Sequence, residues 1–389
     1  MAVELSYVVI SPYSLIKART GVILARLLSR TDLELIGAQI LAFTPEQTQA
    51  YAALLRQEKS KNSEMLADYV LENFTPTGEG KNKRFLLVLF KGEDACRKIA
   101  GIVGGIPYQA PHSLMNGDTI RATYADLIED RDNPAVIRYF EPAVLAPEDW
   151  NRAVPALKLF AEVASQSPNI IANTVGSAPD DEQTLVIIKP DNWRYPSSRP
   201  GNIIDMLSRT GLRIVGCKLY RMSIAEALEF YGPVQQALQE KLAPKIGDRA
   251  RQLLEQELHC PLDNGVLEQL TASVGMRYAD YEFGSLIEFM SGRRPEDCPE
   301  AERNEPGLVK CLVLIYEGKD AIQRIRRVLG PTDPGKAPGG TVRRDFGSNV
   351  MVNTAHASDS PESVRREERI IKISRNHLAA KIDEFLAAN

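Results

Sequence analysis

Cysteine is scarce in this 389-residue chain, and its five cysteines include no CxxC pair. Scattered single cysteines argue against a disulfide framework and against a zinc site of the usual spacing, and they fit a reducing cytosol. The five are Cys96, Cys217, Cys260, Cys298 and Cys311. We therefore expect a cytoplasmic protein without structural disulfide bonds.

Long apolar runs and an excess of basic charge are absent as well. No apolar run approaches the ~20 residues of a membrane-spanning helix. The opening segment MAVELSYVVISPYS lacks the basic region and long apolar region of a secretory signal. The formal net charge is −4 and the pI is about 5.8. Neither a nucleic acid nor a membrane is therefore expected as a partner.

The chain does contain an internal repeat. LLSRTDLELIGAQI (27–40) returns as MLSRTGLRIVGCKL (206–219). Likewise, FLLVLFKGEDACRKIAGIVG (85–104) returns as CLVLIYEGKDAIQRIRRVLG (311–330). Because the same segments recur in the same order, the pattern indicates a duplicated domain and not a short-period solenoid.

The repeat predicts two domains, 1–165 and 182–389. The stretch 166–181 between them is rich in Ser, Asn, Pro, Gly and Asp, as is typical of a linker. The second domain carries extra, mostly helical sequence at about 240–282. The C-terminal segment NHLAAKIDEFLAAN predicts a short amphipathic helix that serves packing or an oligomer contact.

Both copies predict the same order of elements. A short apolar strand that ends at a proline is followed by a helix and a β-branched strand, a further helix, and another strand–helix pair. A loop rich in Pro and Gly then leads to a last strand and helix. This order is typical of a ferredoxin-like split βαβ fold. We therefore predict an α/β (α+β sandwich) protein with two such domains, each a mostly antiparallel sheet with helices packed on it.

His356 is the candidate nucleophile. It directly precedes a predicted helix start, where Asp359 or Ser360 can cap and Pro361 suits the first turn. Backbone N–H groups at such a start attract a phosphoryl anion. A histidine that is largely neutral at cellular pH can attack phosphorus. These residues suit phosphoryl transfer, and a helix-entry or core histidine is the alternative interpretation of the position taken alone.

Four motifs then follow one another over 184–371: TLVIIKPD, VLGPTDP, PGGTVRRDF and NTAHASDSPES. Together they resemble the motif series of the nucleoside diphosphate kinase family. The strongest family signature is the run N-x-x-H-G-S-D-S, which reads NTAHASDS at 353–360 here. The resemblance implies a ping-pong kinase, in which His356 takes the γ-phosphate of a nucleoside triphosphate and passes it to a nucleoside diphosphate. It also implies Mg²⁺, bound through the nucleotide phosphates.

The resemblance also assigns roles around the histidine. Glu367 lies on the apolar, inward-facing side of the helix 361–371 and matches the glutamate that orients the imidazole. Lys189, Arg326 and Arg343 match positions that grip phosphates, and phosphoryl transfer depends mainly on positioning and charge neutralisation. The catalytic set implied in this way is His356, Glu367, Lys189, Tyr231 and Ser358.

A nucleotide pocket completes the assignment. Tyr231, Thr332 and Asn353 match polar positions that contact phosphate, sugar or the histidine region. Phe283 aligns with the aromatic that stacks on the base, and Val350 with the apolar residue on the other face of the base. Stacking tolerates any base, which predicts broad nucleotide specificity. Because the insertion precedes Phe283, a core phenylalanine is the alternative interpretation.

The second copy departs from the family pattern in three places. Ala357 follows the histidine where the family has glycine, and Arg344 replaces a glycine in the crossing loop. After IKPD the segment NWRYPSSRPG is longer than usual, so the arginine normally found there cannot be assigned. None of these changes removes a reacting group.

The first copy has lost most of the predicted chemistry. Ser11 stands at the position of Lys189, Ala100 at Arg326, Pro142 at Asn353 and Leu145 at His356. Arg121 alone is retained, opposite Arg343. The only histidine of this half, His112, falls in a loop away from the nucleophile position. We interpret this copy as catalytically degenerate, serving as a packing partner, with a retained ligand-binding role as the alternative.

The sequence therefore predicts a nucleoside diphosphate kinase. Its partners are nucleoside tri- and diphosphates, and we expect a homo-oligomer or an intramolecular pseudo-dimer. Two alternatives stay open. One is a nucleotide-binding regulatory protein with little turnover. The other is a protein that uses its phosphohistidine to modify another protein.

Overall fold

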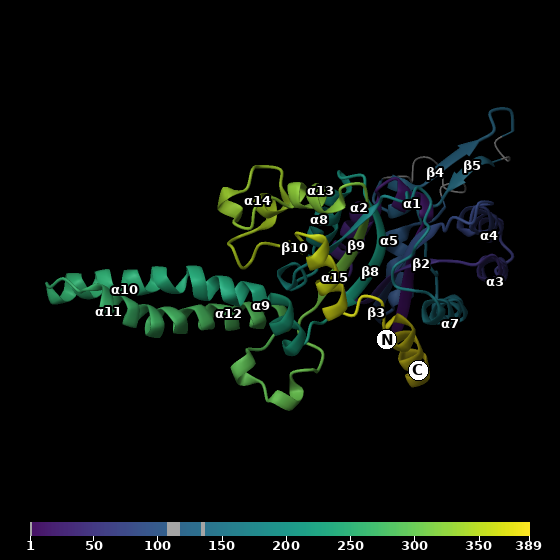
Figure 1. Ribbon diagram of the computed structural model, residues 1–389. Helices are drawn as coiled ribbons and strands as arrows, with labels where there is room; N and C mark the ends of the chain where they lie inside the picture. Colours follow the sequence, from purple (N-terminus) through teal and green to yellow (C-terminus); the bar gives the residue numbers. More distant parts are fainter. Residues whose placement is uncertain (1, 107–116, 134–136) are drawn as a thin grey trace. The chain divides into compact units, whose positions relative to one another are not determined.

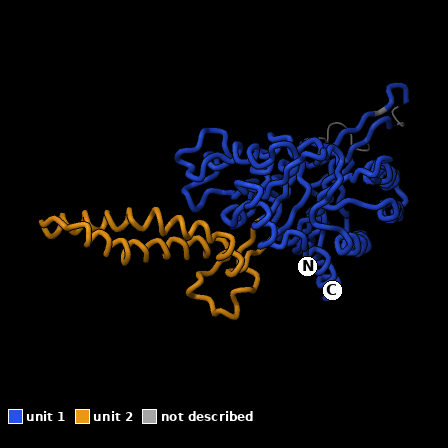
Figure 2. The backbone as a smooth tube through the Cα atoms, viewed as in Figure 1, with its two compact units in different colours: residues 1–219, 312–389 blue, residues 220–311 orange. Residues whose placement is uncertain are grey.

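The computed structural model describes residues 2–106, 117–133 and 137–389. They form two compact units, shown in blue and orange in Figure 2. The first unit comprises residues 1–219 and 312–389, and the second comprises residues 220–311. His112 lies outside the described residues.

The first unit contains two four-stranded sheets with matching strand order (Figure 1). One has the order β2-β3-β1-β6 and the other the order β8-β9-β7-β10. β1 pairs antiparallel with β3 and β6, and β7 pairs antiparallel with β9 and β10. The strands are β1 (Val3–Ile10), β2 (Glu34–Ala42), β3 (Arg84–Glu93), β6 (Val144–Leu145), β7 (Glu182–Ile188), β8 (Arg213–Tyr220), β9 (Cys311–Gly318) and β10 (Ala355–Ala357). The predicted α/β class with ferredoxin-like sheets is confirmed.

Helices follow the strands in the same order in both halves. The first half has α1 (Pro12–Ile16), α2 (Thr20–Ser29), α3 (Pro45–Arg56), α4 (Lys61–Phe74), α5 (Ala95–Val103), α6 (Ile120–Tyr124) and α7 (Trp150–Gln166). A small hairpin, β4 (Asp126–Glu129) and β5 (Ile137–Glu141), precedes β6. The second half has α8 (Arg199–Ser208), α13 (Ala321–Leu329), α14 (Val342–Phe346), α15 (Pro361–Ile370) and α16 (Leu378–Ala388).

The two sheets share one apolar core. Val88 of β3 and Leu314 of β9 belong to the same buried cluster as side chains of α2 and α8. The two helices meet at Gly21 and Gly201, because a Cβ atom at Gly21 would lie 2.6 Å from the carbonyl oxygen of Gly201. Only glycine permits this approach. The shared core explains why both sheets fall in one compact unit.

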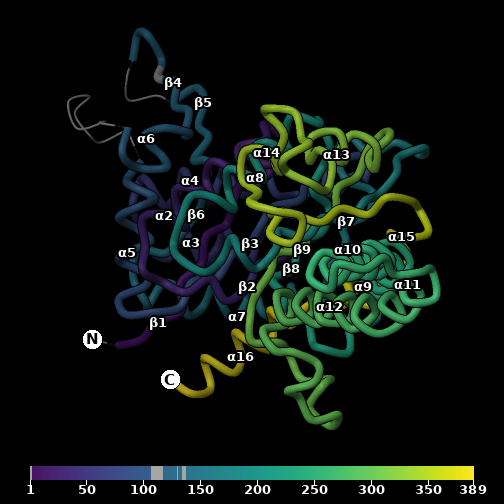
Figure 3. Tube along the Cα trace, turned by 90° about the vertical axis from the view of Figure 1, so that its left-hand side faces the viewer, coloured from purple at the N-terminus to yellow at the C-terminus, as the bar shows by residue number. Residues whose placement is uncertain are grey.

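The outer face of the first sheet is covered by α3, α4, α7 and the C-terminal helix α16, and α16 lies below β2 in the view of Figure 3. Ile382 and Phe385 of α16 are buried there, and the Phe385 ring lies 5.9 Å from that of Trp150, centroid to centroid. Lys381 Nζ donates to the carbonyl of Ile36 at 2.6 Å. The amphipathic helix expected at the C-terminus is thus present, and it fastens the end of the second half to the first half.

The second unit is mainly helical. It contains α9 (Ile224–Lys241), α10 (Ala243–Leu258), α11 (Asn264–Leu270), a π-helical turn (Thr271–Gly275) and α12 (Met276–Ser291). Ser223 and Glu226 form a capping box at the start of α9, since each side chain accepts from the backbone N–H of the other. In the described part of the chain, no helix is long and apolar enough to cross a membrane.

Candidate active site

His356 lies in β10, where it pairs with Ile187 of β7. Its Nε2 atom is 2.9 Å from Oε2 of Glu367 on the next helix, α15. Ser358 Oγ donates to the same carboxylate oxygen at 2.7 Å, and Arg366 Nη2 lies 3.4 Å from the other oxygen, Oε1. Glu367 is 2% exposed, so a carboxylate with three partners is held rigidly behind the ring.

The pairing with Glu367 determines which ring nitrogen can react. A carboxylate only accepts hydrogen bonds, so a neutral imidazole that bonds to it must carry its proton on Nε2. The lone pair then resides on Nδ1. An imidazole held in this way has a lone pair on Nδ1 that can act as a nucleophile, and the neighbouring carboxylate can stabilise positive charge on the ring.

The helix after His356 begins as its sequence suggests. Ser360 Oγ accepts from the backbone N–H of Ser363 at 3.1 Å, and Pro361 occupies the first turn. Asp359 accepts from Ser363 Oγ at 2.7 Å, and this bond holds the pKa of Asp359 below its usual range. Ser360, and not Asp359, is therefore the cap.

A cavity of about 420 Å³ opens beside the histidine segment, and arginines and Ala357 contribute to its wall. Its size falls in the range of small-molecule sites. Arg326 comes from α13 and Arg343 from α14, so two helices contribute arginines to the wall of the cavity. The full lining is Arg326, Arg327, Leu329, Gly330, Pro331, Thr332, Pro338, Thr341, Arg343 and Ala357.

Lys189 is buried at the end of β7. Its Nζ donates to Oδ1 of Asn353 at 2.7 Å and to the carbonyl of Met351 at 3.3 Å. Burial, together with the nearby charge of Arg343, lowers the pKa of Lys189 to about 8. Asn353 Nδ2 in turn donates to the carbonyl of Thr332 at 3.1 Å. A hydrogen-bonded chain thus runs from Lys189 to the wall of the cavity.

Three further predicted residues are Val350, Tyr231 and Phe283. Val350 is 57% exposed in the loop before β10, and its carbonyl accepts from Asn353 Nδ2 at 2.8 Å. Tyr231 and Phe283 are buried residues of the second compact unit. Their contacts with a nucleotide remain predictions. Arg344, one of the departures from the family pattern, donates to the carbonyl of Pro334 at 3.4 Å.

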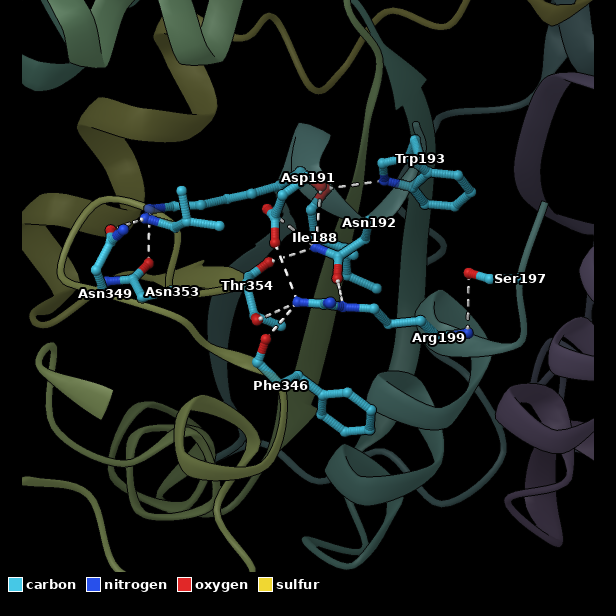
Figure 4. Close-up of polar contacts among 12 residues, drawn as sticks. Ile188, Asp191, Asn192, Trp193, Ser197, Arg199, Phe346, Asn349, Asn353 and Thr354 are labelled. Carbon is cyan, nitrogen blue, oxygen red and sulfur yellow. Dashed lines mark hydrogen bonds and ion pairs between the residues drawn. The ribbon is translucent and has the colours of Figure 1, made fainter. Parts of the chain in front are cut away.

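Arg199 is the residue that sequence reasoning missed. Its guanidinium donates to Asn192 Oδ1 at 2.7 Å and also contacts Asp191, the carbonyl of Phe346 and Thr354 Oγ1 (Figure 4). It begins α8 immediately before Pro200. Because NWRYPSSRPG is longer than usual, the family motif could not be aligned with this arginine. Its position next to Pro200 at a helix start is the one sequence signal that could have identified it.

In the first half, other side chains occupy most of the positions that correspond to the candidate site. Leu145 pairs with Val9 at the register where His356 pairs with Ile187. Ser11 donates to Oε1 of Glu141 at 2.8 Å, where the second half has Lys189. Arg121 donates to the carbonyls of Gly104 and Val144, matching the bonds of Arg343 to Gly330 and Ala355.

Comparison with known proteins decides the family. The family model described as "Nucleoside diphosphate kinase" matches residues 307–374. A nucleoside diphosphate kinase of Staphylothermus marinus is 32% identical over 190 residues, which cover 49% of this chain and 92% of that protein. This chain belongs to the nucleoside diphosphate kinase family.

Further nucleoside diphosphate kinases are similar. The enzyme of Bdellovibrio bacteriovorus is 30% identical over 186 residues, which cover 48% of this chain and 89% of that protein. A solved NDP kinase structure from Pyrobaculum aerophilum is 27% identical, covers 49% of this chain and 94% of its own, and has a TM-score of 0.33. The stretch matched by the nucleoside diphosphate kinase family model contains Arg326, Thr332, Arg343, Asn353, His356 and Glu367.

Proposed function

We propose that this protein is a nucleoside diphosphate kinase that works by a ping-pong mechanism through a phosphohistidine at His356. The observation that carries the proposal is the 2.9 Å pairing of His356 Nε2 with the buried Glu367, beside a cavity walled by arginines. Homologues named nucleoside diphosphate kinase support it. A half-buried, oriented imidazole beside arginines is suited to phosphoryl transfer.

In the first half-reaction, the Nδ1 lone pair of His356 attacks the γ-phosphorus of a nucleoside triphosphate. The N–P bond forms as the bond from phosphorus to the bridging oxygen breaks, and the nucleoside diphosphate leaves with that electron pair. Lys189, Arg326 and Arg343 neutralise charge on the phosphate oxygens. Glu367 balances the positive charge that develops on the ring.

In the second half-reaction, a terminal β-phosphate oxygen of another nucleoside diphosphate attacks the phosphorus. The N–P bond breaks and its electron pair returns to Nδ1, which regenerates the free histidine. Both half-reactions use the same residues, because the leaving group of one step is chemically the nucleophile of the other. Stacking on Phe283 would make the exchange tolerant of the base.

Magnesium enters this scheme as part of the substrate. No group of His, Cys, Asp and Glu within the described ranges is arranged to hold a metal ion. The charged residues in the cavity lining are arginines, which suit phosphate oxygens better than a bare divalent cation. We propose that Mg²⁺ is bound through the nucleotide phosphates.

The first half is proposed to be a duplicated copy without turnover. Leu145 and Ala156 occupy the positions of His356 and Glu367, so neither a nucleophile nor its orienting carboxylate is present. The core shared by the two sheets supports an intramolecular pseudo-dimer, in which this copy packs against the catalytic one.

A labelling experiment tests the proposed function. The full chain is incubated with γ-³²P-ATP, the acid-labile label on the protein is measured, and GDP is then added. Label that forms on the wild type, disappears on adding GDP and is recovered as GTP supports the kinase. Label that never forms, or forms equally on His356→Ala, would contradict it. Label that forms but does not move to GDP would favour transfer to a protein instead.

A further inference from the structure

We propose that Arg199 is a positioning residue that holds the turn before His356 and the segment after Lys189 in one arrangement. The proposal rests on the proposed function, because its kinetic test measures transfer to His356. Its structural basis is the set of contacts that one guanidinium makes with three chain segments (Figure 4). These segments are the turn 189–192, the end of α14 and the turn that leads into β10.

The turn before His356 needs such support. Thr354 has a φ of 76°, and β-branched residues rarely adopt positive φ. Conformations of this kind are strained and persist only where the surroundings enforce them. Thr354 is fully buried, and its carbonyl accepts from the backbone N–H of Lys189 and from Asn192 Nδ2, each at 2.9 Å.

Arg199 also helps to hold Thr354 in this conformation. Its Nη2 lies 3.3 Å from Thr354 Oγ1, and its Nε donates at 2.7 Å to the amide oxygen of Asn192. The amide nitrogen of Asn192 bonds the Thr354 carbonyl. Arg199 therefore fixes Thr354 both directly and through Asn192. Because Thr354 lies two residues before His356 and bonds the backbone of Lys189, a loss of this support would displace nucleophile and cation together.

Comparison with the first half distinguishes the contact of this arginine that belongs to the fold from the contacts that belong to the site. Arg19 stands at the same position, two residues before the glycine at the helix crossing. It donates to the carbonyl of Tyr124 at 2.7 Å, as Arg199 does to that of Phe346. No bond joins Arg19 to Ala143, which has a φ of 62° at the position of Thr354.

The bonds that differ are those that face the active site. In the first half, Tyr13 and Ser14 take the positions of Asp191 and Asn192. The Ala143 carbonyl accepts from Ser14 Oγ at 2.9 Å and from the backbone N–H of Ser11 at 3.1 Å. The helix-to-loop bond belongs to the fold of both halves. The bonds to Asp191, Asn192 and Thr354 occur only where a histidine follows. This difference assigns them to the positioning of His356 and Lys189.

Two variants, Thr354→Val and Arg199→Lys, test the contact between Arg199 and Thr354, and two others serve as controls. Thr354→Val keeps the β-branched shape but removes the hydroxyl that Arg199 contacts, and Thr354→Ser restores the hydroxyl. Arg199→Lys keeps a positive charge but not the planar fork that joins several acceptors. Arg19→Lys is the matched control, because it alters the shared helix-to-loop bond without touching the site.

The first measurement is amide hydrogen exchange, which does not depend on turnover. We expect Arg199→Lys and Thr354→Val to exchange faster at the amides of Lys189 and Ala355 and to leave that of Ser11 unchanged, with Thr354→Ser close to wild type. Unchanged exchange at Lys189 and Ala355 in both variants would overturn the proposal. Because this readout needs no phosphohistidine, it decides the positioning role even if the kinase proposal fails.

The second measurement is the rate of phosphohistidine formation over a range of ATP concentrations. A displaced nucleophile costs up to ~10²-fold in rate, so Arg199→Lys and Thr354→Val should lower the maximal rate by 10-fold or more. The ATP concentration at half-maximal rate should change much less. Arg19→Lys should match wild type. Equal losses in the Arg19 and Arg199 variants would reduce the role to general stability and contradict positioning.

Discussion

Nε2 of His356 lies 2.9 Å from Oε2 of Glu367, and that same oxygen accepts the hydroxyl of Ser358 at 2.7 Å. One carboxylate oxygen therefore fixes both the imidazole and the serine that follows it by two residues. Because Glu367 is buried, its orientation depends on α15 and not on solvent. The orientation of the ring thus depends on a helix that begins five residues after the histidine.

Glu367→Gln should slow phosphohistidine formation by about 10²-fold, since an amide can present its NH₂ group to Nε2 and favour the wrong tautomer. Stopped-flow labelling with ATP measures the rate constant. Glu362→Gln is the matched control, because it makes the same change on the exposed face of α15. A rate for Glu367→Gln within a factor of two of this control would refute the orienting role.

Nucleotide affinity should fall as the pH rises through about 8. Below that pH the ammonium of Lys189 is present and neutralises phosphate. Above it the unliganded protein loses this proton, because burial and Arg343 lower the lysine pKa. Binding must then take the proton up again, which weakens it. Calorimetric titration of ADP between pH 7 and 9.5 measures the effect.

Lys189→Met supplies the comparison for the pH experiment. It should bind ADP more weakly at pH 7 and show no further loss through pH 8. A decline that runs parallel in wild type and Lys189→Met would assign the titration to another group.

Arg121 and Arg343 make matching bonds to backbone carbonyls, yet only Arg343 lines the cavity. Replacing either by leucine leaves two carbonyls without these donors, so each should lower stability by about 1–3 kcal/mol. Only Arg343→Leu should weaken nucleotide binding. Chemical denaturation and ADP titration of both variants test this, and a comparable loss of affinity in Arg121→Leu would contradict the assignment.

The first half should not transfer phosphate even when given a histidine. Leu145→His in a His356→Ala background restores an imidazole at the matching strand register. Ser11, Ala100 and Ala156 still stand where lysine, arginine and glutamate are needed. We expect no acid-labile label above the His356→Ala background. Clear labelling of this double variant would show that the strand position alone suffices.

Much of the site could be predicted because its residues lie in regular elements. The helical phase of 361–371 placed Glu367 inward, and the structure has it buried next to His356. The repeat placed Leu145 opposite the histidine, and the strand registers agree. Lys189 and Asn353 are far apart in sequence, and only the motif series predicts that they belong to one site. In the structure, Lys189 Nζ and Asn353 Oδ1 lie 2.7 Å apart.

Other features depend on packing that no local pattern encodes. The role of Arg199 arises from a loop of unusual length that brings it to Thr354. The common core arises because Gly21 and Gly201 face each other across two helices. Because the two sheets share this core, they form one compact unit, and the second unit, residues 220–311, contains the helical insertion. Such contacts can be identified only when the packing of the two halves in three dimensions is known.

The position of the phosphate on the histidine tests the central claim most directly. The protein is phosphorylated with ATP, and ¹H–³¹P correlation spectroscopy with peptide mapping identifies the modified atom. The account predicts a phosphate on Nδ1 of His356, lost on adding GDP. A phosphate on Nε2, on another residue, or on no residue at all would contradict it.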